Sequence, residues 1–157
     1  MTVITHPRRK NRLAAMIDSP GGVSVGVALE QARANMEAMR ARAMTVVDTG
    51  IEALETTPAP ACLAETPARL EQAYRAATSL IDAAGPFELF DLCRAAAGLC
   101  DLIGATNPDQ PFDWRIVTVH ARSLRLLQAL PLEASEERAR ILDSLHEIIE
   151  RKLGQTG

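Results

Sequence analysis

Residues 66–103 read TPARLEQAYRAATSLIDAAGPFELFDLCRAAAGLCDLI, and this stretch decides the fold class. Thr66 stands where it can cap a helix, and Pro67 occupies the first turn, where a missing N–H costs nothing. Apolar residues then recur at helical spacing until Gly85 ends the first helix and Pro86 begins the next. The apolar face of the first helix comprises Leu70, Ala73, Tyr74, Ala77, Ile81 and Ala84. We therefore expect a helical hairpin, with helices over about 67–84 and 86–103.

Two further helices are predicted after this hairpin. Asp113 can cap a helix over 113–130 that Pro131 ends, and Ser135 can cap a last helix over 135–153. The connecting turns are short, as antiparallel neighbours require, and no alternating strand pattern competes with the helical spacing. The sequence therefore predicts an all-α protein built as an antiparallel four-helix bundle.

A longer helix, over 24–55, is expected before the bundle, and a proline-containing linker, 56–66, joins the two. Its apolar residues alternate in steps of four and three, like the a and d positions of a coiled coil. They are Val25, Leu29, Ala32, Met36, Met39, Ala43, Val46, Gly50 and Leu54. Because alanine and glycine recur among them, packing inside the bundle is one interpretation. A seam between two copies of the chain is the other, and the spacing fits both.

Length and charge bound the possible functions. At 157 residues the chain is the size of one domain, so we expect one helical domain over 23–154 after a flexible arm over 1–22. A net charge of −3 argues against a protein that coats nucleic acid. The arm itself is basic, through Arg8, Arg9, Lys10 and Arg12. We expect it to be solvated, and contact with a partner or a membrane surface is the alternative.

The cysteines and the absence of a leader predict a cytoplasmic location. Cys62, Cys93 and Cys100 are odd in number and lack zinc-ligand spacing, which indicates reduced thiols. No apolar leader opens the chain, and no run reaches the ~18 apolar residues of a membrane span. No residue pattern predicts a metal ion or cofactor.

Histidine is the only residue type that suggests catalysis, and only one of three histidines is a serious candidate. His6 lies in the basic arm and His146 on the outer side of the last helix. His120 lies in the middle of an apolar arc, so we expect it to be buried and hydrogen-bonded. A phosphorylatable histidine must instead face solvent. An active phosphotransfer protein using His120 is therefore the enzymatic alternative, and not the leading interpretation.

The hairpin over 66–103 resembles the central hairpin of histidine-phosphotransfer domains. That family has Ala-His-x-Leu-Lys-Gly-Ser, then a helix-ending glycine and spaced leucines. Here Ala73 and Ser79 match, but Tyr74 stands at the phosphorylated histidine and Ala77-Thr78 replaces Lys-Gly. The resemblance implies a shared bundle from which the phosphoryl chemistry has been lost, because a phenol cannot form a phosphoramidate.

A second resemblance spans residues 11–130. The opening Asn11-Arg12-Leu13, the run Gly98-Leu99-Cys100-Asp101-Leu102, and Trp114 leading to Val119-His120 are similar to small alphaproteobacterial proteins known as CheE-like chemotaxis proteins. This resemblance implies a place in chemotaxis or two-component signalling, and it supplies no catalytic residue.

These observations predict a non-enzymatic signalling adaptor that binds a response-regulator receiver domain or a related partner. The expected contacts on the outer face of the hairpin are Tyr74, Arg75, Ser79 and Arg94. Besides the His120 phosphotransfer protein, the remaining alternative is a structural homodimer formed through the seam from Val25 to Leu54. No contact with nucleic acid is expected.

Overall fold

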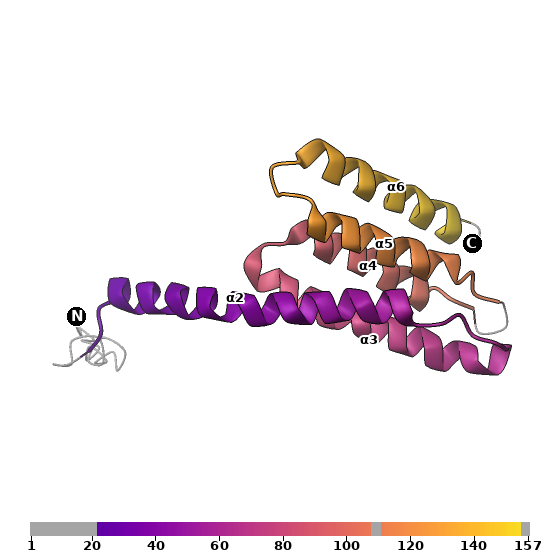
Figure 1. Cartoon of the computed structure of the whole chain (residues 1–157), viewed down its shortest axis with the longest axis horizontal. Coiled ribbons are helices and arrows are strands. Elements are labelled where there is room, and N and C mark those ends of the chain that lie inside the picture. The colour runs from indigo at the N-terminus through magenta and orange to yellow at the C-terminus, as the bar shows by residue number, and fades with distance from the viewer. Residues whose placement is uncertain (1–21, 108–110, 155–157) are drawn as a thin grey trace, which may run out of the picture. The chain divides into compact units, whose positions relative to one another are not determined.

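The computed structural model describes residues 22–107 and 111–154, and this part of the chain contains helices and no strand (Figure 1). The α-helices are α2 (Val25–Thr56), α3 (Thr66–Ala84), α4 (Phe90–Gly104), α5 (Arg115–Ala129) and α6 (Ser135–Leu153). Two short 3-10 turns, η1 (Leu63–Glu65) and η2 (Gly85–Phe87), precede α3 and α4. The predicted all-α class is confirmed. The basic arm, with His6, Arg8, Arg9, Lys10 and Arg12, lies outside the described residues.

The chain divides into two compact units, Met1–Met39 and Arg40–Gly157. Of the first unit, the structure describes the start of α2. Ser24 caps this helix by accepting a hydrogen bond from the backbone N–H of Val27 at 3.3 Å. All the described side chains of this unit are exposed. They include the apolar residues Val25, Leu29, Met36 and Met39.

Helix α4 organises the second unit, because it packs against α3, α5 and α6. Small residues let α3 and α4 lie close together, since Ala73, Ala77, Ala95 and Ala96 are all buried where the core forms. Larger core residues fill the space between the helices. They include Leu80, Leu92, Leu99, Val117, Leu124, Leu127 and Leu145.

The second half of α2 packs on this core with a face that only partly coincides with the predicted apolar stripe. Val47, Gly50, Ile51 and Leu54 are buried, whereas Val46 is 44% exposed. A Cβ added at Gly50 would lie 3.3 Å from the carbonyl oxygen of Ala76, so glycine is what lets α2 approach α3 here. Gly50 and Leu54 belong to the predicted stripe, whereas Val47 and Ile51 lie on the neighbouring face of the helix.

The turn between α3 and α4 is longer than predicted. Helix α4 begins at Phe90 and not at Pro86, because Pro86 lies in the 3-10 turn η2. Glu88 then has a φ of 58°, in the left-handed region that a helix cannot include. Three predicted caps also differ. Helices α3 and α6 begin at Thr66 and Ser135 themselves, each preceded by a residue without a capping side-chain bond. Helix α5 begins at Arg115 with Trp114 at its N-cap, and Asp113, one residue earlier, accepts a hydrogen bond from the backbone N–H of Arg115 at 3.2 Å.

A buried arginine on α6, which the sequence analysis missed, forms hydrogen bonds with the start of α4 and with the end of α5. Arg138 on α6 is 3% exposed, and its Nε donates to Oδ2 of Asp91 at 2.6 Å, near the start of α4. The same guanidinium donates to the carbonyl oxygens of Leu127 and Leu130, at 2.7 and 3.0 Å. These carbonyls are left without helical partners where α5 ends, so Arg138 supplies the missing donors.

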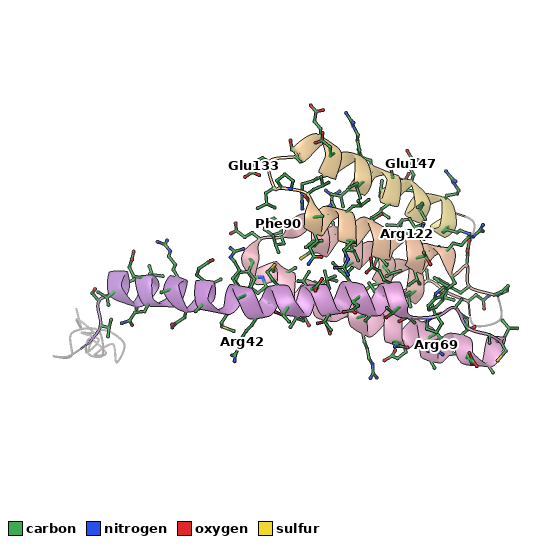
Figure 2. All side chains as sticks on the ribbon, in the orientation of Figure 1. Arg42, Arg69, Phe90, Arg122, Glu133 and Glu147 are labelled. Carbon is green, nitrogen blue, oxygen red and sulfur yellow. The ribbon has the colours of Figure 1, made fainter. Side chains whose placement is uncertain are left out.

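A second arginine ties α5 to the later part of α2. Arg125 donates to Oε2 of Glu55 at 2.7 Å, to Gln128 at 3.0 Å, and to Asp48. These two carboxylates raise the pKa of Arg125 further above its usual range. Figure 2 shows the side chains around the helices, with Arg42 projecting from α2 and Arg122 on α5.

Candidate functional site

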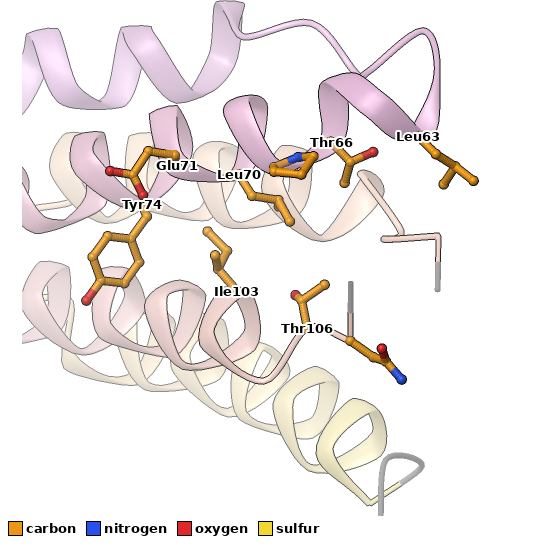
Figure 3. Close-up of a pocket in the computed structure, with 9 residues that line it drawn as sticks. Leu63, Thr66, Leu70, Glu71, Tyr74, Ile103 and Thr106 are labelled. Carbon is orange, nitrogen blue, oxygen red and sulfur yellow. The ribbon is translucent and has the colours of Figure 1, made fainter. Parts of the chain in front are cut away.

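An open, largely apolar groove lies between the start of α3 and the end of α4 (Figure 3). Its volume is about 310 Å³, at the lower end of the range for small-molecule pockets. The lining residues are Leu63, Thr66, Pro67, Leu70, Glu71, Tyr74, Ile103, Thr106 and Asn107. We call it the Tyr74 groove. Its size suits one or two apolar side chains of a protein segment better than a large cofactor.

The helical spacing of α3 explains why these side chains converge. Pro67, Leu70 and Tyr74 follow one another at steps of three and four, so they share one side of the helix. Across the groove, Ile103 and Thr106 come from the last turn of α4 and the residues after it. The Thr106 hydroxyl donates to the carbonyl oxygen of Leu102 at 3.1 Å, which holds this end of the wall in place.

Tyr74 gives the groove its one aromatic ring. The residue is 42% exposed, and Figure 3 shows the ring between α3 and α4, near Glu71. Tyrosine combines a rigid apolar surface with a hydroxyl that can donate or accept a hydrogen bond, which is why it is enriched at protein interfaces. The groove therefore offers an apolar floor, at Leu70 and Ile103, with polar groups at its edge.

The four predicted contact residues are all exposed, but they do not all belong to this groove. Arg75 lies next to it, with its Nε 2.7 Å from Oε1 of Glu71, one of the lining residues. Ser79 lies further along α3. Arg94 is on α4 and lines a different groove. The structure thus brings Tyr74 and Arg75 together and separates Arg94 from them.

The groove at Arg94 lies between α4 and α6 and has a volume of about 320 Å³. Its polar residues are Arg94, Asp101 and His146. Nε2 of His146 is 3.2 Å from Oε1 of Glu150, one turn along the same exposed helix. A third groove, of about 290 Å³, lies between α5 and α6 and includes Arg115, Arg151 and Lys152. Neither contains an arrangement of nucleophile and base.

His120, the candidate phosphoryl acceptor, is 0% exposed. Its Nδ1 is 2.8 Å from the carbonyl oxygen of Ile116, so Nδ1 must carry the proton and donate it. Nε2 is therefore the unprotonated nitrogen, and it is buried without a hydrogen-bond partner. Burial lowers the pKa of the ring below its usual value. A partner could reach this nitrogen only if the surrounding helices moved apart.

Gly98 explains how the histidine ring is enclosed. A Cβ at Gly98 would lie 2.5 Å from Cδ1 of Ile149 and 3.9 Å from Nε2 of His120. The isoleucine from α6 thus occupies the space that a side chain at position 98 would need. The same glycine lies against the imidazole, whose buried Nε2 has no hydrogen-bond partner, and such surroundings favour the neutral ring.

The three cysteines are free thiols. Cys62 is exposed, while Cys93 and Cys100 are half-buried on the side of α4 that faces α3. Burial raises the pKa of both half-buried thiols, so they stay protonated and weakly reactive. Among residues 22–107 and 111–154, no cluster of histidine, cysteine and carboxylate side chains is arranged to hold a metal ion.

The sequence analysis found Tyr74 but missed the rest of its groove. Leu63 and Ile103 were not expected to meet, because the linker conformation decides where Leu63 lies. Its only signal was a single leucine in a proline-containing segment of mostly small residues. Arg138 was missed for a similar reason, since an arginine on a helix gives no sign in the sequence that its partners lie on other helices.

The described part of the chain is thus an all-helical protein whose recesses are grooves between helices. No helix in that part is long and apolar enough to cross a membrane. No protein-family model matches the chain, and comparisons with curated proteins and with solved structures found no match either.

Proposed function

We propose that this protein is a non-enzymatic adaptor of bacterial two-component or chemotaxis signalling, acting in the cytoplasm. It binds the receiver domain of a response regulator, or a related partner, at the Tyr74 groove. In this proposal α3 to α6 form a bundle similar to that of histidine-phosphotransfer domains. The resemblance of the hairpin sequence to that family supports the choice of partner.

The observation that carries the proposal is the exposure of Tyr74 beside an open apolar groove. Tyr74 stands at the position of the phosphorylated histidine in the pattern that the hairpin resembles. A phenol in that place keeps a surface for docking while removing the group that would accept phosphate. The apolar floor then supplies binding energy, since burying apolar surface is the main favourable contribution in most protein associations.

Arg75 extends this surface by a charged group. Its ion pair with Glu71 is exposed on both sides, so the pair contributes little to stability and can be exchanged for contacts with a partner. Arg94 lines another groove. If Arg94 also contributes to the binding of the partner, the docking surface extends beyond the Tyr74 groove. We expect the largest energetic contribution from the aromatic ring, as at other interfaces.

The proposal is tested by titrating the isotope-labelled chain with receiver domains, in their resting and beryllofluoride-activated forms, followed by NMR. We expect shifts centred on Leu70, Tyr74 and Ile103. Tyr74→Ala should weaken binding about tenfold or more, as the loss of an interface anchor does. Arg122→Ala, an exposed change on α5, is the control and should leave the affinity unchanged.

Two results would count against it. Binding that is unaffected by Tyr74→Ala would place the partner elsewhere on the chain. The absence of binding to any receiver domain from the same organism would remove this class of partner. Tyr74→Phe separates the contributions of the ring and of the hydroxyl.

A further inference from the structure

The exposed first half of α2 carries an apolar stripe that nothing in the proposed function uses. We infer that this stripe, formed by Val25, Leu29, Ala32, Met36 and Met39, binds an acidic amphipathic helix of another protein. The five residues follow in steps of four and three, which places them on one face of the helix. The larger ones are 46% to 75% exposed.

The spacing of the stripe favours a helix as the occupant. Steps of four and three are the spacing at which side chains of one helix insert between those of another. A helix that lies on a membrane surface instead has a wide apolar face with large aromatic or leucine side chains. Here the stripe is narrow, contains Ala32 at its centre and has no aromatic residue.

The charges beside the stripe favour an acidic partner. Helical geometry places Arg33 on one flank and Arg42, further along the same helix, on the other. The nearest acidic residues, Glu30 and Glu37, lie further from the stripe on the helix surface. Among residues 22–42 there are three basic residues and two acidic ones.

A second copy of α2 fits less well than an acidic helix. In an antiparallel pair centred on Ala32, Arg33 would meet its own counterpart, and in a parallel pair no carboxylate would lie beside the seam. Like charges at these positions oppose pairing. The five residues also span only two heptads, whereas sustained coiled coils need about three or four. The stripe is therefore suited to a partner that supplies both the negative charge and further binding surface.

The test is site-specific photo-cross-linking of the full chain in the cells that produce it. A benzoylphenylalanine is introduced at Leu29 or Met36, and at Ala34 on the opposite face of the helix as the matched control. We expect adducts from positions 29 and 36 and none from 34. The cross-linked segment, identified by mass spectrometry, should have apolar residues at steps of three and four with aspartate or glutamate beside them.

Charge reversal then tests the electrostatic part. Arg33→Glu should lower the yield of the adduct about tenfold, and a lysine at the facing acidic residue of the partner should restore it. Tyr74→Ala should leave the adduct unchanged, so failure here and failure of the receiver-binding proposal are distinguishable. Circular dichroism of each variant checks that the exposed changes leave the helices intact.

Three outcomes would overturn the inference. One is an adduct with a second copy of this chain, together with a dimer in sedimentation at micromolar concentration. Another is an adduct with lipid, or binding to anionic phosphatidylglycerol vesicles that Leu29→Gln abolishes. The last is equal labelling from positions 29, 34 and 36, or none from any of them.

Discussion

The two halves of α2 are similar in sequence and opposite in surroundings. From Val25 to Met39 the apolar side chains are exposed, whereas Val47, Ile51 and Leu54 are only 0% to 2% exposed. Both halves contain alanine and valine, with charges between them. The difference is that the second half meets α3 and α5 through Gly50 and through the carboxylates that bind Arg125. An apolar periodicity thus defines a face, and only tertiary contacts decide whether it is covered.

The largest expected effect comes from removing a buried side chain of the second half. Ile51→Ala should lower the free energy of unfolding by about 3 kcal/mol, since it leaves a cavity in the core. Leu29→Ala, in the first half of the same helix, is the matched control and should change it by less than about 0.5 kcal/mol. Urea denaturation measures both. Equal effects would show that the two halves do not differ as described.

The glycines sharpen the same contrast. Gly50→Leu should lower the free energy of unfolding by about 2 kcal/mol, because its side chain would meet Ala76 and Leu80. A Cβ at Gly26 would make only an ordinary contact, 4.0 Å from Oγ of Ser24, so Gly26→Ala should only increase local helicity, with a gain of at most about 1 kcal/mol. Chemical denaturation and circular dichroism report the two changes. A Gly50→Leu variant as stable as the parent would mean that α2 does not approach α3 closely.

The buried His120 should make the free energy of unfolding depend on pH. Burial lowers the pKa of His120, so the folded state binds fewer protons than the unfolded chain below about pH 6.5. Its contribution to stability is therefore present above that pH and is lost as the pH falls through the lower folded pKa. The change is at most about 1.4 kcal/mol per pH unit. Urea denaturation of the parent and of His120→Phe, between pH 7 and 5, should show a shallower slope of the free energy of unfolding against pH in the variant.

The smallest effect is expected where α2 is tied to α5 by charge. Arg125→Ala should lower the free energy of unfolding by about 1 kcal/mol, because its ion pairs are partly exposed to solvent. A double-mutant cycle with Glu55→Gln isolates the pair. The coupling should diminish in 1 M salt, and a coupling that persists there would show that the contact is shape-dependent and not ionic.

Local signals in the sequence were enough to predict the helices. Proline and glycine punctuation placed α3, and apolar spacing placed α4, α5 and α6, because these patterns act within a few residues. The start of α4 was wrong by four residues, since Pro86 opens a 3-10 turn and Glu88 adopts a left-handed conformation. That outcome depends on how the hairpin closes, which no local pattern encodes.

The candidate site was predictable only in part. Tyr74 could be singled out because it stands in a recognisable pattern. Its 42% exposure could not be predicted, since the apolar spacing placed it on the same face as Ala73 and Ala77, which are buried. The groove beside it could not, since Leu63 and Ile103 are forty residues apart in the chain and line the same groove only after the linker folds. The register of α2 was likewise undetermined, because Val46 and Val47 are equally apolar and only packing chooses between them.

Arg138 has a consequence for how the second unit opens. Its guanidinium bonds to the end of α5 and to the start of α4 while its backbone belongs to α6, so α6 cannot detach without leaving two carbonyls and a carboxylate unpaired. Losing a buried charged partner of this kind is costly. The C-terminal helix should therefore not fray separately. Native-state hydrogen exchange should show the amides around Arg138 and those of the last turn of α5 opening together, as one cooperative unit.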